Sequence, residues 1–197
     1  MTNEDTKEST MNVEMEVVEE DWAMVDSGDL KGIKNESGAF LTLSSECTKD
    51  IDRWRTMPSF EEYTSLKKLD LYKNRYIKEL HDSVCGLTSL EVLSLVRCEK
   101  LLSLPANIGN LKNLQEIDLT DASELSSLPE SIGELSNLRK LTIGGHQGSG
   151  NKVLKTLPST IVKLTSLEIL CLDKCKELES LPSDLGNLKS LRVLLMR

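Results

Sequence analysis

The stretch "LEVLSLVRCEKLLSLPANIGNLKNL" spans Leu90–Leu114, and "LEILCLDKCKELESLPSDLGNLKSL" spans Leu167–Leu191. The two stretches place their leucines, one cysteine, one proline and one glycine at the same offsets. Agreement of this kind indicates an internal repeat. A repeat decides the fold, because each unit must bury its apolar side chains against its neighbours.

The motif LxxLxL, with isoleucine or methionine at some of its leucine positions, sets the period of this repeat. The copies follow one another at steps of 24, 24, 24, 29 and 24 residues. Chance could supply one such match, but hardly a series in register. The copies begin at Leu66, Leu90, Leu114, Leu138, Leu167 and Leu191.

Each unit has two halves with different hydrophobic periods. The first half, such as "LEVLSLVRC", alternates leucine with polar residues and predicts a strand. The second half, such as "LLSLPANIGNLKN", spaces Leu104, Ile108 and Leu111 as a helical turn does, and Pro105 fits a first helical turn. One strand and one turn cannot bury their own leucines, so we expect the units to stack around a continuous core.

The pattern LxxLxLxxC-xxLxxLPxxIGxL resembles that of leucine-rich repeat proteins, over about Tyr63–Arg197. It is most similar to the intracellular repeats of plant-type nucleotide-binding immune receptors and their algal relatives, and to the leucine-rich scaffolds of Ras and phosphatase signalling. The resemblance implies an α/β solenoid: a right-handed horseshoe with a parallel concave sheet of six strands and short convex helical turns.

The sequence departs from this family pattern in several places. No G-x-x-x-x-G-K-[ST] loop is found, so the nucleotide-dependent switching of immune receptors is not implied. His81 stands at the proline position of the first unit, and Val162 stands where the fourth unit should have glycine. The last strand is followed by no visible polar cap, such as solenoids usually have.

Charge is unevenly distributed along the 197 residues. The net charge is -8, and residues 1–30 hold ten acids and one base, so the rest of the chain carries about +1. A nearly neutral repeat region is a poor nucleic-acid binder, since that affinity comes mostly from cations. No signal peptide or apolar span is visible, and five cysteines without framework spacing suggest reduced thiols. We therefore expect a cytoplasmic protein that binds neither nucleic acid nor membrane.

Three regions are predicted. Residues 1–50 are acidic and rich in turn residues, which predicts a disordered tail. Within it, "MEVVEEDWAMVD" (Met15–Asp26) either solvates the chain, folds onto a partner with Trp22 as anchor, or folds back onto the basic first unit. Residues 51–65 are interpreted as an N-terminal cap built on Trp54, Phe60 and Tyr63, and residues 66–197 as the repeat domain of about six units.

Catalytic and metal-binding signals are weak. The ninth position of each unit, which points inward in the family, holds Asn74, Cys98, Ala122, His146 and Cys175. Zinc between His146 and Cys175 is conceivable, but zinc usually takes four ligands, so a structural ladder is favoured. No metalloprotease, hydrolase or nucleotide-binding motif is present. We expect a protein without enzyme activity, cofactor or metal.

The insertion "GGHQGSGNK" (Gly144–Lys152) accounts for the single 29-residue step. It lacks the Lys-Ser/Thr pair and the following helix of a phosphate-binding loop. Two interpretations remain open. It is either a plain bulge where the strand ends or a binding loop at the rim of the horseshoe.

Partner binding is predicted for the residues that flank the inward leucines, because they point to the opposite side of a strand. The first unit is basic with an aromatic residue, the third is acidic, and the fifth and sixth are expected to expose Ile169, Cys171, Val193 and Leu195 side by side. The predicted contacts are Lys68, Asp70, Tyr72, Lys73, Val92, Arg97, Glu116, Asp118, Lys140, Ile169, Val193 and Leu195.

These features favour a non-catalytic protein–protein interaction module with a scaffold or signalling role. Two alternatives remain: a structural subunit that self-associates through Val193–Arg197, and a regulator of a bound enzyme. The exposed aliphatic cluster of the fifth and sixth units has two interpretations: it marks an interface, as such clusters often do, or it is covered by more chain beside the missing cap.

Overall fold

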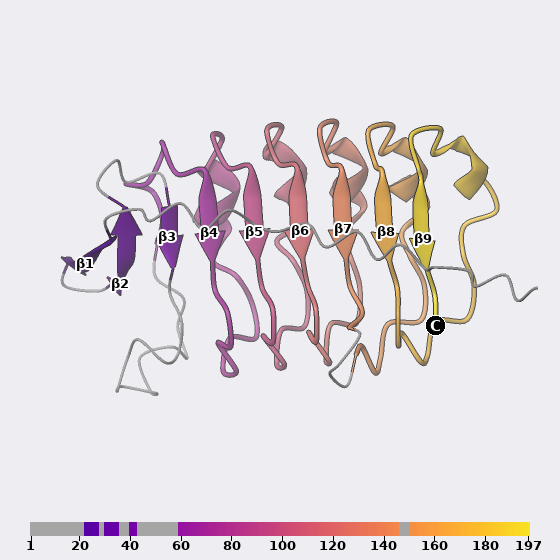
Figure 1. Ribbon diagram of the computed structural model, residues 1–197, viewed down its shortest axis with the longest axis horizontal. Helices are drawn as coiled ribbons and strands as arrows, with labels where there is room; N and C mark the ends of the chain where they lie inside the picture. The colour runs from indigo at the N-terminus through magenta and orange to yellow at the C-terminus, as the bar shows by residue number, and fades with distance from the viewer. Residues whose placement is uncertain (1–21, 28–29, 36–39, 43–58, 146–149) are drawn as a thin grey trace, which may run out of the picture.

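The computed structural model describes residues 22–27, 30–35, 40–42, 59–145 and 150–197; for the first two ranges it describes the backbone only. Nine strands form one sheet in chain order (Figure 1). The strands are β1 (Trp22–Ser27), β2 (Leu30–Asn35), β3 (Phe40–Thr42), β4 (Lys68–Asp70), β5 (Val92–Ser94), β6 (Glu116–Asp118), β7 (Lys140–Thr142), β8 (Ile169–Cys171) and β9 (Val193–Leu195).

The strands from β3 to β9 pair in parallel, which makes seven parallel strands where the repeat predicted six. The extra strand, β3, lies in the segment predicted to be disordered. Its Leu41 pairs in register with Leu69 and is 1% exposed. Burial of this leucine against the first unit therefore stabilises the strand. β1 and β2 extend the sheet as an antiparallel hairpin.

The disorder prediction is therefore wrong for β1, β2 and β3. The remainder of residues 1–50 lies outside the described residues, as does Trp54 of the predicted cap. Phe60 of that cap is fully buried and meets Tyr63 edge to face at 6.3 Å between ring centroids. The domain boundaries themselves stay a prediction.

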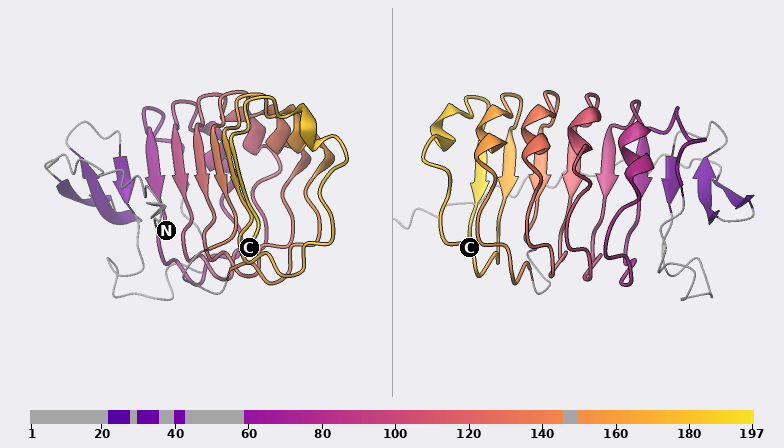
Figure 2. Two further views of the ribbon diagram at one scale, coloured as in Figure 1. Left: turned by 45° about the vertical axis from the view of Figure 1, so that its right-hand side comes forward. Right: turned by 180° about the vertical axis from the view of Figure 1, so that it is seen from behind.

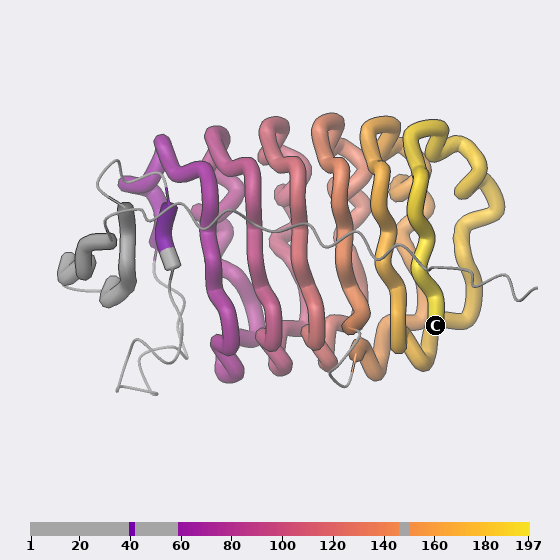
Figure 3. The backbone as a smooth tube through the Cα atoms, in the orientation of Figure 1, coloured from indigo at the N-terminus to yellow at the C-terminus, as the bar shows by residue number. Residues whose placement is uncertain are grey.

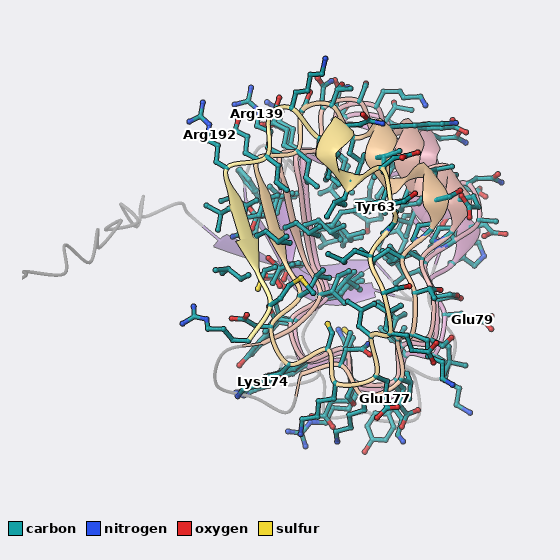
Figure 4. The ribbon with its side chains drawn as sticks, turned by 90° about the vertical axis from the view of Figure 1, so that its right-hand side faces the viewer. Tyr63, Glu79, Arg139, Lys174, Glu177 and Arg192 are labelled. Atoms are coloured by element: carbon teal, nitrogen blue, oxygen red, sulfur yellow. The ribbon has the colours of Figure 1, made fainter. Side chains whose placement is uncertain are left out.

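Short 3-10 helices lie opposite the sheet, so the predicted convex helical turns are confirmed. Side chains fill the space between the two layers, as the view along the stack shows (Figure 4). Their centre is a continuous aliphatic core of leucine and isoleucine. The helices are η2 (Asp82–Gly86), η3 (Ile108–Asn110), η4 (Glu130–Glu134), η5 (Ser159–Lys163) and η6 (Leu185–Asn187).

Proline and glycine shape these turns. Pro129 and Pro158 occupy the N-cap positions of η4 and η5 with extended backbones, just before the helical residues rather than among them. In η2 the N-cap is His81, whose Nδ1 accepts a hydrogen bond from the N–H of Ser83. Glycine is required at Gly133, where a Cβ atom would collide with the backbone carbonyl of Thr160 in the next unit.

The coils lie side by side along the stack (Figure 3), and a ladder of polar side chains joins them. The residue before each LxxLxL motif is Ser or Asn, and in the third to sixth units its side chain donates to a carbonyl of the preceding unit. Asn113 donates to Thr88 (2.8 Å), and Asn137 donates to Lys112 (2.8 Å). Ser166 and Ser190 do the same in the later units. These bonds satisfy carbonyls that the repeated turns leave unpaired.

The insertion changes which residue takes the ninth position of the fourth unit. At the eighth position, Lys73, Arg97, Asp121 and Lys174 have φ of 57–59°, and in the fourth unit Gly150 takes this conformation at φ 66°. The ninth position there is consequently Asn151, not His146 as predicted. The insertion falls between Gly145 and Gly150, and His146 lies outside the described residues.

Asn151 is 0% exposed and satisfies four backbone groups. Its Nδ2 donates to the carbonyls of Ala122 (3.0 Å) and Leu125 (2.8 Å). Its Oδ1 accepts from the N–H groups of Val153 (3.0 Å) and Leu154 (2.7 Å). In the second unit Cys98 plays a simpler part, with Sγ donating to the carbonyl of Leu71 at 3.2 Å. The ninth position is therefore a structural ladder in both units.

None of the helices among the described residues is long and apolar enough to cross a membrane. Within the same residues, no group of three or more His, Cys, Asp or Glu side chains could hold a metal ion.

Candidate functional site: the open sheet face

We call the side of the sheet away from the 3-10 helices the open sheet face; Figure 2 shows the stack from two further directions. The register aligns its residues in two columns. The first column is Lys68, Val92, Glu116, Lys140, Ile169 and Val193, and the second is Asp70, Ser94, Asp118, Thr142, Cys171 and Leu195.

The strand pattern that predicted these columns holds in each unit. The middle residue of β4, Leu69, is fully buried, whereas Lys68 and Asp70 on either side of it are partly exposed. The same order repeats in β5, β6 and β7. Nine of the twelve predicted contacts therefore lie in the two columns, and Tyr72, Lys73 and Arg97 lie at the strand ends.

The first unit presents a cation beside an aromatic ring. The Nζ of Lys73 lies 4.9 Å from the centroid of the Tyr72 ring, within the range of a cation–π contact. Asp70 stands in the same unit, and its Oδ1 accepts a hydrogen bond from the N–H of Tyr72 at 3.1 Å. This end of the face can attract a carboxylate of a partner.

The centre of the face is internally paired, which the sequence pattern did not predict. Lys140 donates from Nζ to Oε1 of Glu116 at 2.7 Å. Partial burial acts to lower the pKa of Lys140, but the hydrogen bond to Glu116 and the charges of Glu116 and Asp118 outweigh it and raise this pKa. Glu116 and Lys140 thus satisfy each other before any partner arrives.

At the strand ends, buried aspartates hold arginines. Asp121 is 6% exposed, and its Oδ2 lies 3.8 Å from Nε of Arg97. Its Oδ1 accepts from the N–H of Gly150 at 3.0 Å, which fixes the base of the insertion. Asp173 repeats the arrangement with Arg197: Oδ1 accepts from the backbone N–H at 2.8 Å, and Oδ2 lies 3.8 Å from Nε. Asp121 and Asp173 therefore hold the backbone of the next unit in place.

The far end of the face is aliphatic. Ile169 pairs with Val193, and Cys171 pairs with Leu195, so these side chains are neighbours as predicted. Val193 is 37% exposed, but Cys171 is only 4% exposed. The prediction that Cys171 is displayed on the face is therefore wrong. Burial raises the pKa of its thiol, which keeps it neutral.

Two further sequence predictions are not tested. Trp22 lies in β1, whose side chains are outside the described residues, so its role as a tail anchor stays a prediction. Self-association through Val193–Arg197 also stays a prediction; in β9 the inward Leu194 and the outward Val193 are both exposed.

Comparisons with known proteins agree with the repeat. Residues 121–197 match the family model described as a leucine-rich repeat region. No curated protein matches the sequence. The more specific resemblance to plant-type immune receptors and Ras-pathway scaffolds stays a prediction.

Three solved structures illustrate the likeness. A leucine-rich-repeat protein of Leptospira interrogans is 25% identical, with a TM-score of 0.42; the match covers 80% of this chain but only 49% of that one. Internalin C2 of Listeria monocytogenes is 20% identical, with a TM-score of 0.46, and 81% and 80% are covered. The leucine-rich repeat domain of the type III effector XopL is 23% identical, with a TM-score of 0.44, and 80% and 76% are covered. The repeat spacing, the parallel sheet and the family match together identify the fold as a leucine-rich-repeat solenoid.

Proposed function

We propose that the chain is a non-catalytic protein-binding module that holds a partner against the open sheet face. The proposal rests on one observation: the side chains of the first column change from charged at one end to aliphatic at the other. Lys68 stands at one end and Ile169 and Val193 at the other, with the paired Glu116 and Lys140 between them. A surface with charged and aliphatic ends suits a protein better than a polyanion.

The hydrogen bonding of the sheet supports recognition by side chains. Each strand from β4 to β8 pairs with a strand on both sides, so its backbone groups are already used. A partner therefore cannot add a strand there. It must instead contact the side chains of the two columns. Lys68, Tyr72 and Lys73 would bind acidic groups, and Ile169, Val193 and Leu195 would supply apolar contact.

We further propose that the module acts in the cytoplasm as a scaffold or signalling component. The four cysteines in the described part of the chain are free thiols, which fits a reducing compartment. Imaging of the tagged chain in its own cells checks the compartment. A signal confined to the cell exterior would contradict it.

The binding proposal is tested by affinity capture with the full chain, followed by titration of each purified candidate against matched variants. The face variants are Lys68→Glu and Val193→Glu. The control is Lys163→Glu, which makes the same charge change as Lys68→Glu but on η5, on the opposite side of the sheet. We expect each face variant to weaken binding by about tenfold or more, and the control to leave it unchanged.

Circular dichroism and thermal unfolding confirm that the variants remain folded. If partners bind the face variants and the control with equal affinity, binding is located elsewhere and the proposal fails. If only the control weakens binding, the helical side is the binding surface.

A further inference from the structure

The C-terminal end of the stack exposes the layer that the earlier coils bury. Leu170, the inward residue of β8, is 0% exposed, whereas Leu194, which pairs with it in β9, is 40% exposed. The neighbouring Met196 is 48% exposed. Other leucines of this end are only partly buried, although their counterparts in the earlier units are buried: Leu178, Leu181, Leu185 and Leu191. An uncovered aliphatic layer of this kind favours an interface.

The backbone of the last coil presents the groups with which each earlier coil binds its successor. The carbonyl of the second residue of a unit accepts two N–H groups of the next unit, as that of Glu168 does. The N–H of the sixth residue donates to the next strand, as that of Leu172 does to the carbonyl of Leu195 at 2.8 Å. In the last unit these groups are the carbonyl of Arg192 and the N–H of Met196, and neither has a hydrogen-bond partner among the described residues. A further parallel strand can therefore pair with β9.

Gly186 lies where two earlier glycines make room for the next coil. A Cβ atom on Gly109 would collide with the carbonyl oxygen of Ser131, and one on Gly133 with that of Thr160. A Cβ atom on Gly186 would meet no atom within 4 Å. The last turn, η6, therefore leaves open the space that the turn of a following coil occupies in the earlier units.

The ladder of polar side chains specifies two side chains of the occupant. In the third unit the hydroxyl of Ser131 donates to a carbonyl of the preceding turn at 2.6 Å, and Asn137, six residues later, donates to the carbonyl of Lys112. The counterpart carbonyls of the last turn belong to Ser183 and Lys189, and no described residue donates to them. An occupant that uses both carries Ser or Thr, then Ser or Asn six residues later, directly before an LxxLxL motif.

The six copies of this motif in the chain are already stacked against one another, so none of them is free to fill the end. The turns lie toward the start of the strands (Figure 1), so an inverted second copy paired with β9 would place its turn at the far end of that strand, away from Gly186. We propose that the C-terminal end of the stack binds a leucine-rich coil of a partner polypeptide, with its strand parallel to β9 and its turn beside Gly186. This surface is the edge of β9 and the end of the core, so the inference stands apart from the proposed function of the open sheet face.

A peptide that copies Glu130–Ile143, "ESIGELSNLRKLTI", supplies Ser131, Asn137 and the motif, and its binding to the full chain is measured by fluorescence anisotropy. Gly186→Ala should weaken binding by about tenfold or more, because its Cβ occupies the space of the peptide's turn. Gly86→Ala is the matched control, since it also adds a Cβ that meets no atom within 4 Å, but in the first unit. The peptide with Asn137→Ala should bind about threefold more weakly.

A covalently attached coil separates the end surface from the source of the coil. A copy of Asp121–Ile143 placed after Arg197 continues the 24-residue register, and we expect it to slow hydrogen exchange at the N–H of Met196 by about tenfold or more. If the attached coil slows exchange but the free peptide does not bind, the coil belongs on the same polypeptide and the partner assignment is wrong. If neither has an effect, or if the peptide binds both glycine variants equally, the end does not receive a coil. A dimer in sedimentation that Leu194→Glu dissociates would make a second copy the occupant and overturn the proposal.

Discussion

The N–H of Gly150 donates a hydrogen bond to Oδ1 of Asp121 at 3.0 Å, across 29 residues of chain. Gly145, at the start of the insertion, also lies against this carboxylate, and a Cβ atom there would come within 2.6 Å of Oδ1. Both ends of the insertion therefore meet at Asp121. One buried side chain closes the longer fourth unit and lets the 24-residue register resume.

Substitutions of Asp121 should lower the free energy of unfolding. The loss should be larger when the hydrogen bond from Gly150 is removed completely than when an acceptor remains. Asp121→Ala leaves the buried N–H of Gly150 without a partner, and we expect a loss of about 1–3 kcal/mol in the free energy of unfolding. Asp121→Asn keeps an acceptor and tolerates the left-handed backbone, so its loss should be smaller. Urea denaturation measures both. Equal losses would mean that the charge facing Arg97 matters more than the bond to Gly150.

Asn151 should be among the most sensitive polar positions in the stack. Asn151→Ala removes both donors and the acceptor of a fully buried side chain, which leaves two carbonyls and two N–H groups without these bonds. We expect a loss of about 3 kcal/mol or more. Asn137→Ala is the matched control, because it breaks one exposed bond and should cost about 1 kcal/mol. Similar losses at both sites would contradict a special role for Asn151.

Much of the fold follows from the repeat because its leucines are spaced as strand and turn require. The columns of the open sheet face follow too, since alternation along a strand fixes which side a residue takes. Asn151 could have been found by counting backwards, since it precedes Leu167 by the same distance as Ala122 precedes Leu138. Counting forwards through the insertion selected His146 instead.

Other features depend on contacts that a single sequence does not display. β3 has no LxxLxL motif, and its pairing with β4 depends on one buried leucine, Leu41. The pairing of Glu116 with Lys140 needs the register of β6 and β7, and only that register shows that two predicted contacts satisfy each other. The polar ladder had a visible signal, the Ser or Asn before each motif, which becomes meaningful once the coils are stacked.

Lys73 is held in the left-handed backbone region at φ 59°, which costs a residue with a side chain about 1–2 kcal/mol. Lys73→Gly and Lys73→Ala both remove the ammonium above Tyr72, but only glycine relieves the backbone strain. We therefore expect Lys73→Gly to be more stable than Lys73→Ala by about 1 kcal/mol in thermal or urea unfolding. An alanine variant at least as stable as the glycine variant would show that the strain is absent.

Cys98 should make stability fall at alkaline pH. Burial raises the pKa of its thiol from 9.0 to about 12, because the thiolate is poorly solvated in the core. The folded-state pKa lies above the unfolded value, so this contribution is complete below pH 9 and is lost as the pH rises toward 12. At pH 10 the unfolded thiol is mostly ionised and the folded one is not, which costs about 1.4 kcal/mol. Unfolding curves of the wild type and Cys98→Ala are compared between pH 7 and pH 10. Because all other groups titrate in both proteins, the difference between the two curves gives the contribution of the Cys98 thiol to the free energy of unfolding. We expect the stability difference between them to shrink by that amount as the pH rises; a constant difference would mean that the folded thiol ionises as readily as the unfolded one.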